Sequence, residues 1–302
     1  MALYVNTNVS SINAQRKLAN STLALNTSYQ RLSSGLRINS SKDDAAGLQI
    51  SDRLTAQING LNQGNRNAND GIALAQTIEG ALDETTNMLQ KIRTLAVQSV
   101  NGTNTQDDRL SLKKEANALM EEVTRIATQT KFGGKTVLNG GGHSTSIYGK
   151  VGNAGDSAAG ELFIQVGANN GDKINLTVAN ATFSVLADGI ADVTNGYDQG
   201  GEGVLLSAAT SAEAVIDIMD AMIQKVDSQR SNLGAIQNRL ESTIRNQANV
   251  AANQSDARSR IRDADFAEES ANLSQQSIIQ QAATSMLMQA NSRPQLALSM
   301  LG

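Results

Sequence analysis

The sequence lacks cysteine and tryptophan, and its 302 residues include one histidine, one proline, four phenylalanines and four tyrosines. Without cysteine there is no disulfide, thiolate nucleophile or sulfur metal ligand. The single histidine, His143, cannot build a histidine-rich metal centre. With so few rings, Ala, Leu, Ile and Val must fill the core, which is typical of narrow helical bundles. These shortages disfavour most classes of enzyme.

Charge and hydropathy narrow the classes of partner. The 25 basic and 29 acidic residues give a net charge of −4, so no general attraction to nucleic acid or to an anionic membrane is expected. No basic stretch followed by an apolar run is found at the start, so no secretory signal peptide is predicted. No stretch approaches the roughly 18 apolar residues that span a bilayer. Composition alone therefore favours a cytoplasmic protein without membrane insertion.

Glycine divides the chain into a centre and two flanks. Sixteen of the 25 glycines lie between Gly133 and Gly203. Because glycine destabilises helices and favours turns, the centre is expected to hold loops and strands, and both flanks are expected to be helical. Within the centre, the alternating segments 162–166 and 174–178 flank the turn-forming segment 169–172, which predicts a β-hairpin.

The N-terminal flank begins with a coiled-coil pattern. Its seam residues recur at alternating spacings of four and three, which is the a/d pattern of a coiled-coil helix: Leu18, Thr22, Leu25, Tyr29, Leu32 and Leu36. Gly35 interrupts the pattern. Ser41, followed three residues later by Asp44, predicts that a new helix starts there with a capping box.

Two further helices are expected before the central region. The first covers about 44–99 and ends at Asn101-Gly102. Thr105 and Asp108 then predict the start of a helix that runs to about Gln129.

The C-terminal flank predicts two helices. Thr210 and Glu213 resemble a capping box that opens the first. Its seam includes polar Gln229, Thr243 and Gln247, which indicates register control at some cost in stability. A break near 263–265 precedes a last helix over about 266–301, which Pro294 should weaken or kink near its end.

The sequence contains no complete catalytic, nucleotide-binding or metal-binding motif. Gly134-Lys135-Thr136 resembles the end of a phosphate-binding loop, but the glycine required five positions earlier is Gln129. The acidic pair Asp43-Asp44 adjoins a helix start, where capping explains it better than catalysis. A Ser-His-Asp triad would have to use His143, which we expect in a solvated loop. The sequence predicts no catalytic residue, no cofactor and no metal site.

The terminal segments are expected to be loose in a single chain. Ordering the first 40 or so residues loses more conformational entropy than the few apolar residues of their seam can offset. Packing against other copies would supply the missing burial. A repeated contact that does not close produces a helical filament.

Several segments resemble the signatures of bacterial flagellin. In the first half they are Arg31–Ile50, Asn65–Ile72, Leu95–Ser99 and the hairpin segment Ile164–Asn169. In the second half they are Ser231–Ser242, Ala257–Phe266 and Gln280–Ala282. The resemblance spans roughly 1–180 and 205–302 in order.

This resemblance implies a mainly α fold, a long coiled-coil-like bundle of discontinuous terminal helices with a small β-hairpin in the middle. Residues 1–43 with 264–302 would form an inner domain of terminal helices. Residues 44–182 with 208–263 would form a helical core domain with its hairpin near 161–179, and 183–207 would be a short variable insert. The chain would thus be a near-minimal flagellin.

The implied function is structural. The chain would be a subunit that self-assembles into the flagellar filament for swimming motility, with the hook–filament junction protein of the same family as the alternative. A metallopeptidase, which some flagellins carry in the variable region, requires His-Glu-x-x-His, and 183–207 contains no histidine. The resemblance also replaces the cytoplasmic expectation with an extracellular one, because flagellins leave unfolded through the flagellar type III route without a cleaved signal peptide. Implied partners are other copies, the export apparatus, an export chaperone, the filament cap and the hook-junction proteins.

Three residue sets are predicted to carry this function. The terminal-helix assembly seam is Leu18, Leu25, Tyr29, Leu32, Leu36, Ile278, Ala282 and Met286. The core-domain seam is Leu54, Ile58, Leu61, Ile72, Leu82, Leu89, Met222, Val226, Leu233, Ile236 and Leu240. A surface formed by Gln90, Lys91, Arg93, Leu95, Gln98 and Glu115 matches the patch that the animal flagellin-sensing Toll-like receptor contacts, and that also packs between subunits. Lys91 replaces the arginine common in detected flagellins, and lysine cannot make a bidentate fork, so we expect weakened detection.

Overall fold

The computed structural model describes residues 7–141, 145–148, 159–188, 190, 196–198 and 203–299, the stretch 293–299 by its backbone. His143 therefore lies outside the described residues. The chain forms two compact units. The first comprises Met1–Ile58 and Val250–Gly302, and the second comprises Asn59–Asn249.

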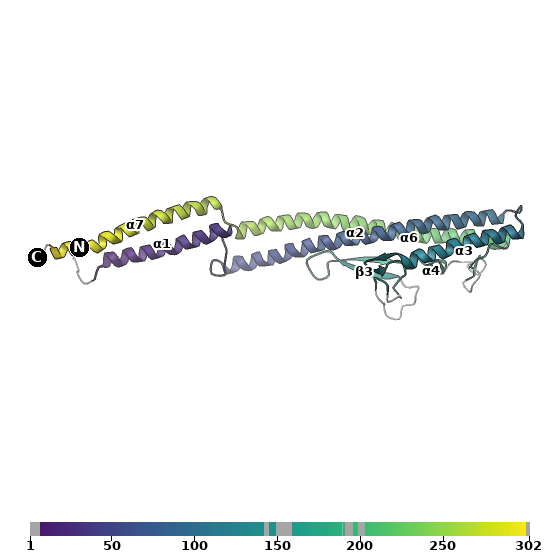
Figure 1. The fold of residues 1–302 in the computed structure, drawn as a ribbon, viewed down its shortest axis with the longest axis horizontal. Coiled ribbons are helices and arrows are strands. Elements are labelled where there is room, and N and C mark those ends of the chain that lie inside the picture. The colour runs from purple at the N-terminus through teal and green to yellow at the C-terminus, as the bar shows by residue number, and fades with distance from the viewer. Residues whose placement is uncertain are drawn as a thin grey trace. The chain divides into compact units, whose positions relative to one another are not determined.

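Long helices dominate both units, which confirms the mainly α fold (Figure 1). They are α1 (Val9–Ser34), α2 (Ala45–Val100), α3 (Gln106–Gln129), the short α4 (Phe183–Ala187), α6 (Ala209–Arg262) and α7 (Phe266–Ser299). The last helix includes Pro294, so the expected weakening does not end it there.

The helix boundaries show which capping predictions were right. Gly35 ends α1 in the left-handed conformation, with φ of 70°, and its N–H donates to the Arg31 carbonyl. Thr105 and Asp108 form the predicted capping box of α3.

Two capping predictions were wrong. Asp44, rather than Ser41, lies directly before α2, and its carboxylate accepts the N–H of Gly47 at 2.9 Å. Asp43 instead accepts the N–H groups of Ser40 and Asn39 in the preceding turn, and these bonds, chiefly that from Ser40, lower the pKa of its carboxyl. Thr210 lies inside α6, which already starts at Ala209. The sequence pattern places a cap only to within a residue or two, because any short polar side chain near the end competes for the free N–H groups.

Three antiparallel two-stranded sheets lie between the helical flanks. They pair β1 (Lys131–Phe132) with β2 (Lys135–Thr136), β3 (Gly160–Gln165) with β4 (Lys173–Val178), and β5 (Tyr197–Asp198) with β6 (Gly203–Val204). The β3–β4 pair is the predicted hairpin, with Leu162 opposite Leu176 and Ile164 opposite Ile174. Alternate residues Ile174, Leu176 and Val178 are buried, so one face of the hairpin joins the core.

In the second unit α2 and α6 run antiparallel. Asp83 and Arg230 form an ion pair of 3.0 Å between them, and Arg93 with Asp220 forms another of 2.6 Å. Between these helices, α3 and the hairpin lies an aliphatic core whose fully buried members include Ile78, Leu82, Leu89, Leu176 and Leu233.

The segment 183–207, predicted as a variable insert, contributes to this core where the structure describes it. Phe183 and Leu206 are buried, and the rings of Phe183 and Tyr197 meet edge to face at 5.2 Å. The ammonium group of Lys225 on α6 donates to the carbonyls of Leu186 and Asp188 at the end of α4. The described part of the insert is therefore packed into the second unit.

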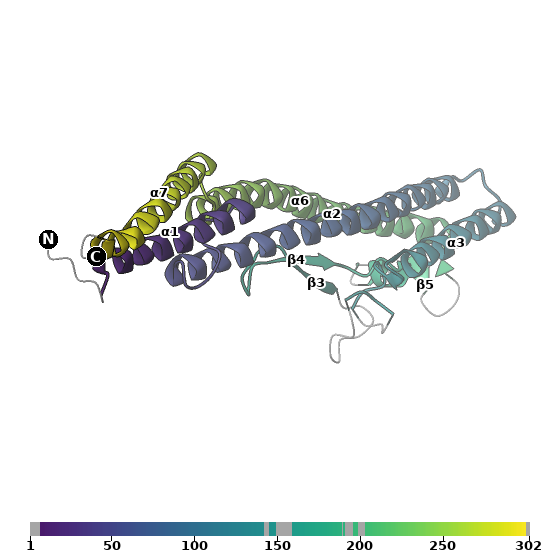
Figure 2. The ribbon, with the colours of Figure 1, turned by 60° about the vertical axis from the view of Figure 1, so that its left-hand side comes forward.

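Glycines on α2 let the hairpin approach closely. A Cβ at Gly64 would overlap the carbonyl oxygen of Val166, and one at Gly71 would lie 2.5 Å from the Ile164 Cδ1. Both views of the fold show β3 and β4 alongside α2 (Figures 1 and 2). Glycine is needed here because another residue's side chain would hold the strand away from the helix.

Candidate assembly surfaces

In the first unit α1 and α7 pair antiparallel. Asn8 of α1's cap donates its amide to the carbonyl of Ala290 at 2.7 Å, while Arg31 at the other end of α1 forms an ion pair of 3.6 Å with Glu269. The two helices lie side by side along their length (Figure 1).

The face of α1 toward α7 follows a heptad pattern, but not in the predicted register. Leu18, Leu25 and Leu32 belong to it, as predicted. The intervening positions are the buried serines Ser21 and Ser28, whereas the sequence pattern placed Thr22 and Tyr29 there. Tyr29 is 57% exposed, and Leu36 lies beyond the end of α1 and is half-buried.

Small polar side chains explain this register. The hydroxyl of Ser21 donates to the main-chain carbonyl of Gln276 on α7 at 3.0 Å, and the hydroxyl of Ser11 donates to the Asn291 side chain at 2.7 Å. A serine reaches the neighbouring helix's backbone only when the two axes are close, and small residues permit that approach. A heptad pattern defined by large apolar residues does not include the serines of such a seam.

The inward face of α7 is likewise different from the predicted one. It consists of buried or half-buried residues at alternating spacings of four and three: Glu269, Leu273, Gln276, Gln280, Ala283, Leu287 and Ala290. The predicted Ile278, Ala282 and Met286 lie outside this face and are exposed. Thus α7 has a face of mixed polar and apolar residues toward α1, and separate apolar side chains that this chain leaves exposed.

Large apolar side chains are concentrated on the outside of this helix pair. Among the described residues, nine of the 13 exposed large hydrophobic side chains lie on α1 and α7: Val9, Ile12, Leu23, Tyr29, Phe266, Ile278, Ile279, Met286 and Met288. A groove of about 550 Å³ runs between the two helices, lined on α7 by Ile279, Ala282 and Met286 and on α1 by Ala14 and Lys17. Exposed apolar side chains gathered on one pair of helices are typical of interaction surfaces.

Main-chain hydrogen bonds join the segment that follows α1 to the segment that precedes α7. Arg37 N–H donates to the Arg262 carbonyl at 2.7 Å, and Ala264 N–H donates to the Gly35 carbonyl at 3.0 Å. Leu36 and Asp263 form an isolated antiparallel bridge between these bonds. The predicted breaks near Gly35 and near 263–265 therefore lie next to each other and are tied together.

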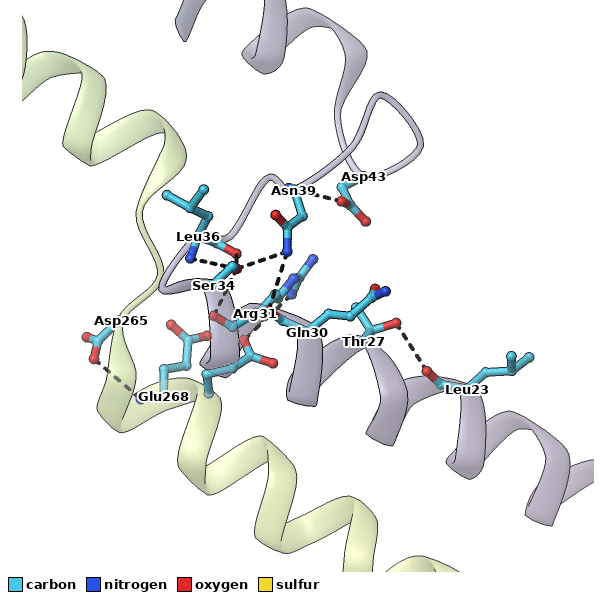
Figure 3. A network of polar contacts seen from close by, with 11 residues as sticks. Leu23, Thr27, Gln30, Arg31, Ser34, Leu36, Asn39, Asp43, Asp265 and Glu268 are labelled. Atoms are coloured by element: carbon cyan, nitrogen blue, oxygen red, sulfur yellow. Dashed lines mark hydrogen bonds and ion pairs between the residues drawn. The ribbon is translucent and has the colours of Figure 1, made fainter.

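Side-chain hydrogen bonds are also formed at the C-terminus of α1, beside these main-chain bonds. The Ser34 hydroxyl oxygen accepts the N–H of Leu36 at 3.1 Å and the side-chain amide of Asn39 at 2.9 Å (Figure 3). Beside them Glu269 is 6% exposed and is paired with Arg31. Because a buried carboxylate needs a partner, this ion pair helps to define the register of α1 against α7.

The predicted core-domain seam lies mostly in the interior. Its buried members are Ile58, Leu61, Leu82, Leu89, Met222, Val226, Leu233, Ile236 and Leu240, while Leu54 and Ile72 are half-buried.

Two of the three polar positions predicted in the seam of α6, Gln229 and Gln247, hold the hairpin, and the third, Thr243, bonds within its own helix. Gln247 donates its amide to the Val166 carbonyl, and Gln229 donates to the Thr177 carbonyl at 3.0 Å. From α2, Asn67 donates to the Gln165 carbonyl at 2.9 Å. The first two residues were predicted to control helix register, but their described bonds satisfy carbonyls of the hairpin.

Comparison with known proteins gives the family. The model of the bacterial flagellin N-terminal helical region matches residues 5–142, and that of the C-terminal helical region matches residues 216–301. Flagellin B of Vibrio cholerae is 39% identical over 376 aligned residues, which cover all of both chains, and flagellin A of Vibrio anguillarum is 39% identical over 378, again over all of both. The chain belongs to the bacterial flagellins.

This flagellin is a structural, non-enzymatic subunit of the flagellar filament, which is an extracellular assembly. The comparisons confirm the first of the two predicted functions and correct the cytoplasmic location that composition favoured. The aligned lengths exceed the flagellin's 302 residues, so these relatives carry segments that it lacks. Among solved structures, Bacillus cereus flagellin is 27% identical, with a TM-score of 0.46, covering 60% of this chain and 88% of that one.

The predicted recognition surface of the flagellin is only partly a surface. Lys91 and Glu115 are exposed and form an ion pair of 3.5 Å between α2 and α3. Arg93 is held by Asp220 through two bonds of 2.6 and 3.1 Å, which raise the pKa of the guanidinium. Leu95 is 7% exposed and belongs to the core, so within a single chain it cannot supply the contact area expected of it. Gln90 and Gln98 are exposed.

Membrane-spanning helices and metal-binding clusters are both absent from the described part of the flagellin. No helix there is long and apolar enough to cross a membrane. No cluster of three or more His, Cys, Asp or Glu side chains suited to a metal ion occurs there.

Proposed function

We propose that α1 and α7 form the surface by which this flagellin polymerises. In this proposal Leu18, Leu25 and Leu32 hold the helix pair together, while Tyr29, Ile278, Ala282 and Met286 contact other copies. The observation that carries the proposal is the concentration of exposed apolar side chains on these two helices. Because each copy would offer different surfaces to its two neighbours, the contact repeats without closing and builds a helical filament.

Packing energetics support the same assignment. Several buried residues of the α1–α7 seam are serine or alanine, which contribute little apolar area: Ser11, Ser21, Ser28, Ala283 and Ala290. Ordering 60 helical residues is costly by comparison. The helix pair therefore gains most of its stability when other copies cover its outer side, and the prediction that the termini become ordered on assembly stands as part of this proposal.

The proposed surface also assigns a position in the filament to each segment of the chain. We assign residues 1–43 and 264–302 to the inner part of the filament, where exposed apolar side chains are covered. Residues 44–182 and 208–263 would surround it, together with the described part of the segment 183–207, since Phe183 and Leu206 are buried in the same core.

Export and assembly partners are proposed from family membership. The subunit would leave unfolded through the flagellar type III route, without a cleaved signal peptide, assisted by the export apparatus and an export chaperone. It would polymerise beneath the filament cap onto the hook-junction proteins. The absence of cysteine supports this route, because no disulfide has to be broken for unfolding.

Detection by the animal Toll-like receptor is a further proposal. The exposed pair Lys91 and Glu115 would lie in the contact, and we expect Lys91→Arg to strengthen receptor activation because arginine can form a bidentate fork. Equal activation by the two monomers would contradict this.

Seeded polymerisation tests the main proposal. Purified full-length monomer should extend filament seeds, whereas a chain lacking residues 1–40 should keep the helicity of its second unit and fail to extend them. Ile278→Ser should also reduce growth, while Gln281→Ser, exposed on the same helix, should not. If full-length monomer stays unpolymerised with fresh seeds, or if the truncated chain grows normally, the proposal is wrong.

A further inference from the structure

Methionine is distributed unevenly between buried and exposed positions. In the described residues, Met219 and Met222 are fully buried, and Met88 and Met120 are half-buried. Met286 and Met288 on α7 are 64% and 68% exposed. A thioether of this exposure can be oxidised by a peroxide, whereas a buried one is shielded.

These two exposed methionines differ in their surroundings. Met286 lines the groove between α1 and α7, beside Ile279, Ala282 and Ala283. Met288 is two positions further along the helix and does not line that groove. Residues two apart lie on different sides of a helix, so α7 has two methionines of similar exposure, only one of which lines the groove.

We propose that Met286 is an oxidation site through which hydrogen peroxide prevents this flagellin from polymerising. The inference rests on the proposed function, because it requires a second copy to cover the groove. Oxidation converts a flexible apolar side chain into a polar sulfoxide. Burying that polar group against the apolar groove without a hydrogen-bond partner is unfavourable.

The chemical step is a two-electron oxidation that balances. The Met286 sulfur attacks one oxygen of hydrogen peroxide, a sulfur–oxygen bond forms and the oxygen–oxygen bond breaks. After proton transfer the products are the sulfoxide and one water molecule, so sulfur is oxidised and the peroxide is reduced. Because polymerisation would cover Met286, the reaction belongs to the free subunit, and the assembled filament protects this sulfur.

The two methionines provide a matched pair of variants. Full-length wild type, Met286→Leu and Met288→Leu are treated with hydrogen peroxide, and sulfoxide at each methionine is measured by peptide mass spectrometry. Seeded growth is then followed by sedimentation. Growth of each protein is compared with that of its own untreated sample. Wild type and Met288→Leu should lose growth about tenfold as sulfoxide accumulates at residue 286, whereas peroxide should not lower the growth of Met286→Leu below its own untreated rate. Enzymatic reduction of the sulfoxide should restore wild-type growth.

Three results would overturn the inference. They are equal loss of growth by Met286→Leu and wild type, undiminished growth of wild type with residue 286 fully oxidised, and equal sulfoxide formation at residue 286 in filament and monomer. Should Met286→Leu itself assemble poorly, unoxidised Met286→Gln and Met288→Gln decide the matter, because only the first should impair growth. Failure of untreated wild type to extend seeds would instead refute the proposed function.

Discussion

The second unit buries 37 of the 42 hydrophobic side chains that are buried among the described residues, and the first unit buries five, two of which are the alanines Ala283 and Ala290. Exposed apolar side chains are distributed in the opposite way. Among the described residues, α1 and α7 of the first unit carry most of the large ones. The apolar content of the two units thus serves different ends. In the second unit it stabilises the single chain, and in the first it remains available to other copies.

The sharpest test of this contrast compares one leucine and one isoleucine. Leu89 is fully buried in the second unit, and Ile278 is 66% exposed in the first. We expect Leu89→Ala to lower the free energy of unfolding by about 2–5 kcal/mol and Ile278→Ala to change it by no more than about 0.5 kcal/mol. Urea denaturation of the monomer, followed by circular dichroism, measures both. A comparable loss for Ile278→Ala would show that the first unit depends on apolar burial within one chain.

A smaller effect is expected at the glycines of α2. In Gly64→Ala the new Cβ would overlap the Val166 carbonyl oxygen, so the hairpin must shift, at a cost of about 1–3 kcal/mol. The matched control is Gly80→Ala, also within α2, where no neighbouring atom lies within 4 Å and the helix should gain up to about 1 kcal/mol. Thermal unfolding of the two variants distinguishes them. If both variants are stabilised, the close approach of hairpin and helix is not a stabilising feature of the second unit.

The smallest effect is expected at the start of α3 and depends on pH. The side chain and main chain of Thr105 bond the carboxylate of Asp108 and lower its pKa. A lowered pKa in the folded state means that the stabilisation is present above the pKa of an unfolded aspartate and is lost as the pH falls through the folded value. Amide exchange at the start of α3 should therefore quicken on acidification. Asp108→Asn should weaken this response, and Asp107→Asn, at the neighbouring position, should leave it unchanged.

Much of this architecture is predictable from local patterns. Gly35, the Thr105–Asp108 pair and the Asn101-Gly102 dipeptide marked helix ends correctly, because capping and backbone freedom act over three or four residues. The hairpin was predictable because alternation over 174–178 matches the two-residue repeat of a strand.

The candidate assembly surface was less predictable. Leu18, Leu25 and Leu32 were identified, but the serines between them were not, since serine in a helix usually faces water. Only the proximity of the α7 backbone makes Ser21 an interior residue. Similarly, Ile278 and Met286 have the spacing of a seam, yet both are exposed outside the partner face of α7, with Met286 lining the groove beside that face. Spacing alone cannot make this distinction.

Sequence by itself determined the helical flanks, the hairpin, most helix ends and the resemblance to flagellins, because each depends on short-range backbone preferences or on contiguous motifs. Tertiary structure alone decided which apolar residues the chain covers and which it leaves exposed. It also showed that Gln229 and Gln247 donate hydrogen bonds to carbonyls of the hairpin, and that glycines of α2 allow the hairpin to pack closely against this helix. The physical reason is that burial and hydrogen-bond partnership depend on what lies opposite a residue in space. That neighbour can be distant in the chain, as with Ser21 and Gln276, which are 255 positions apart.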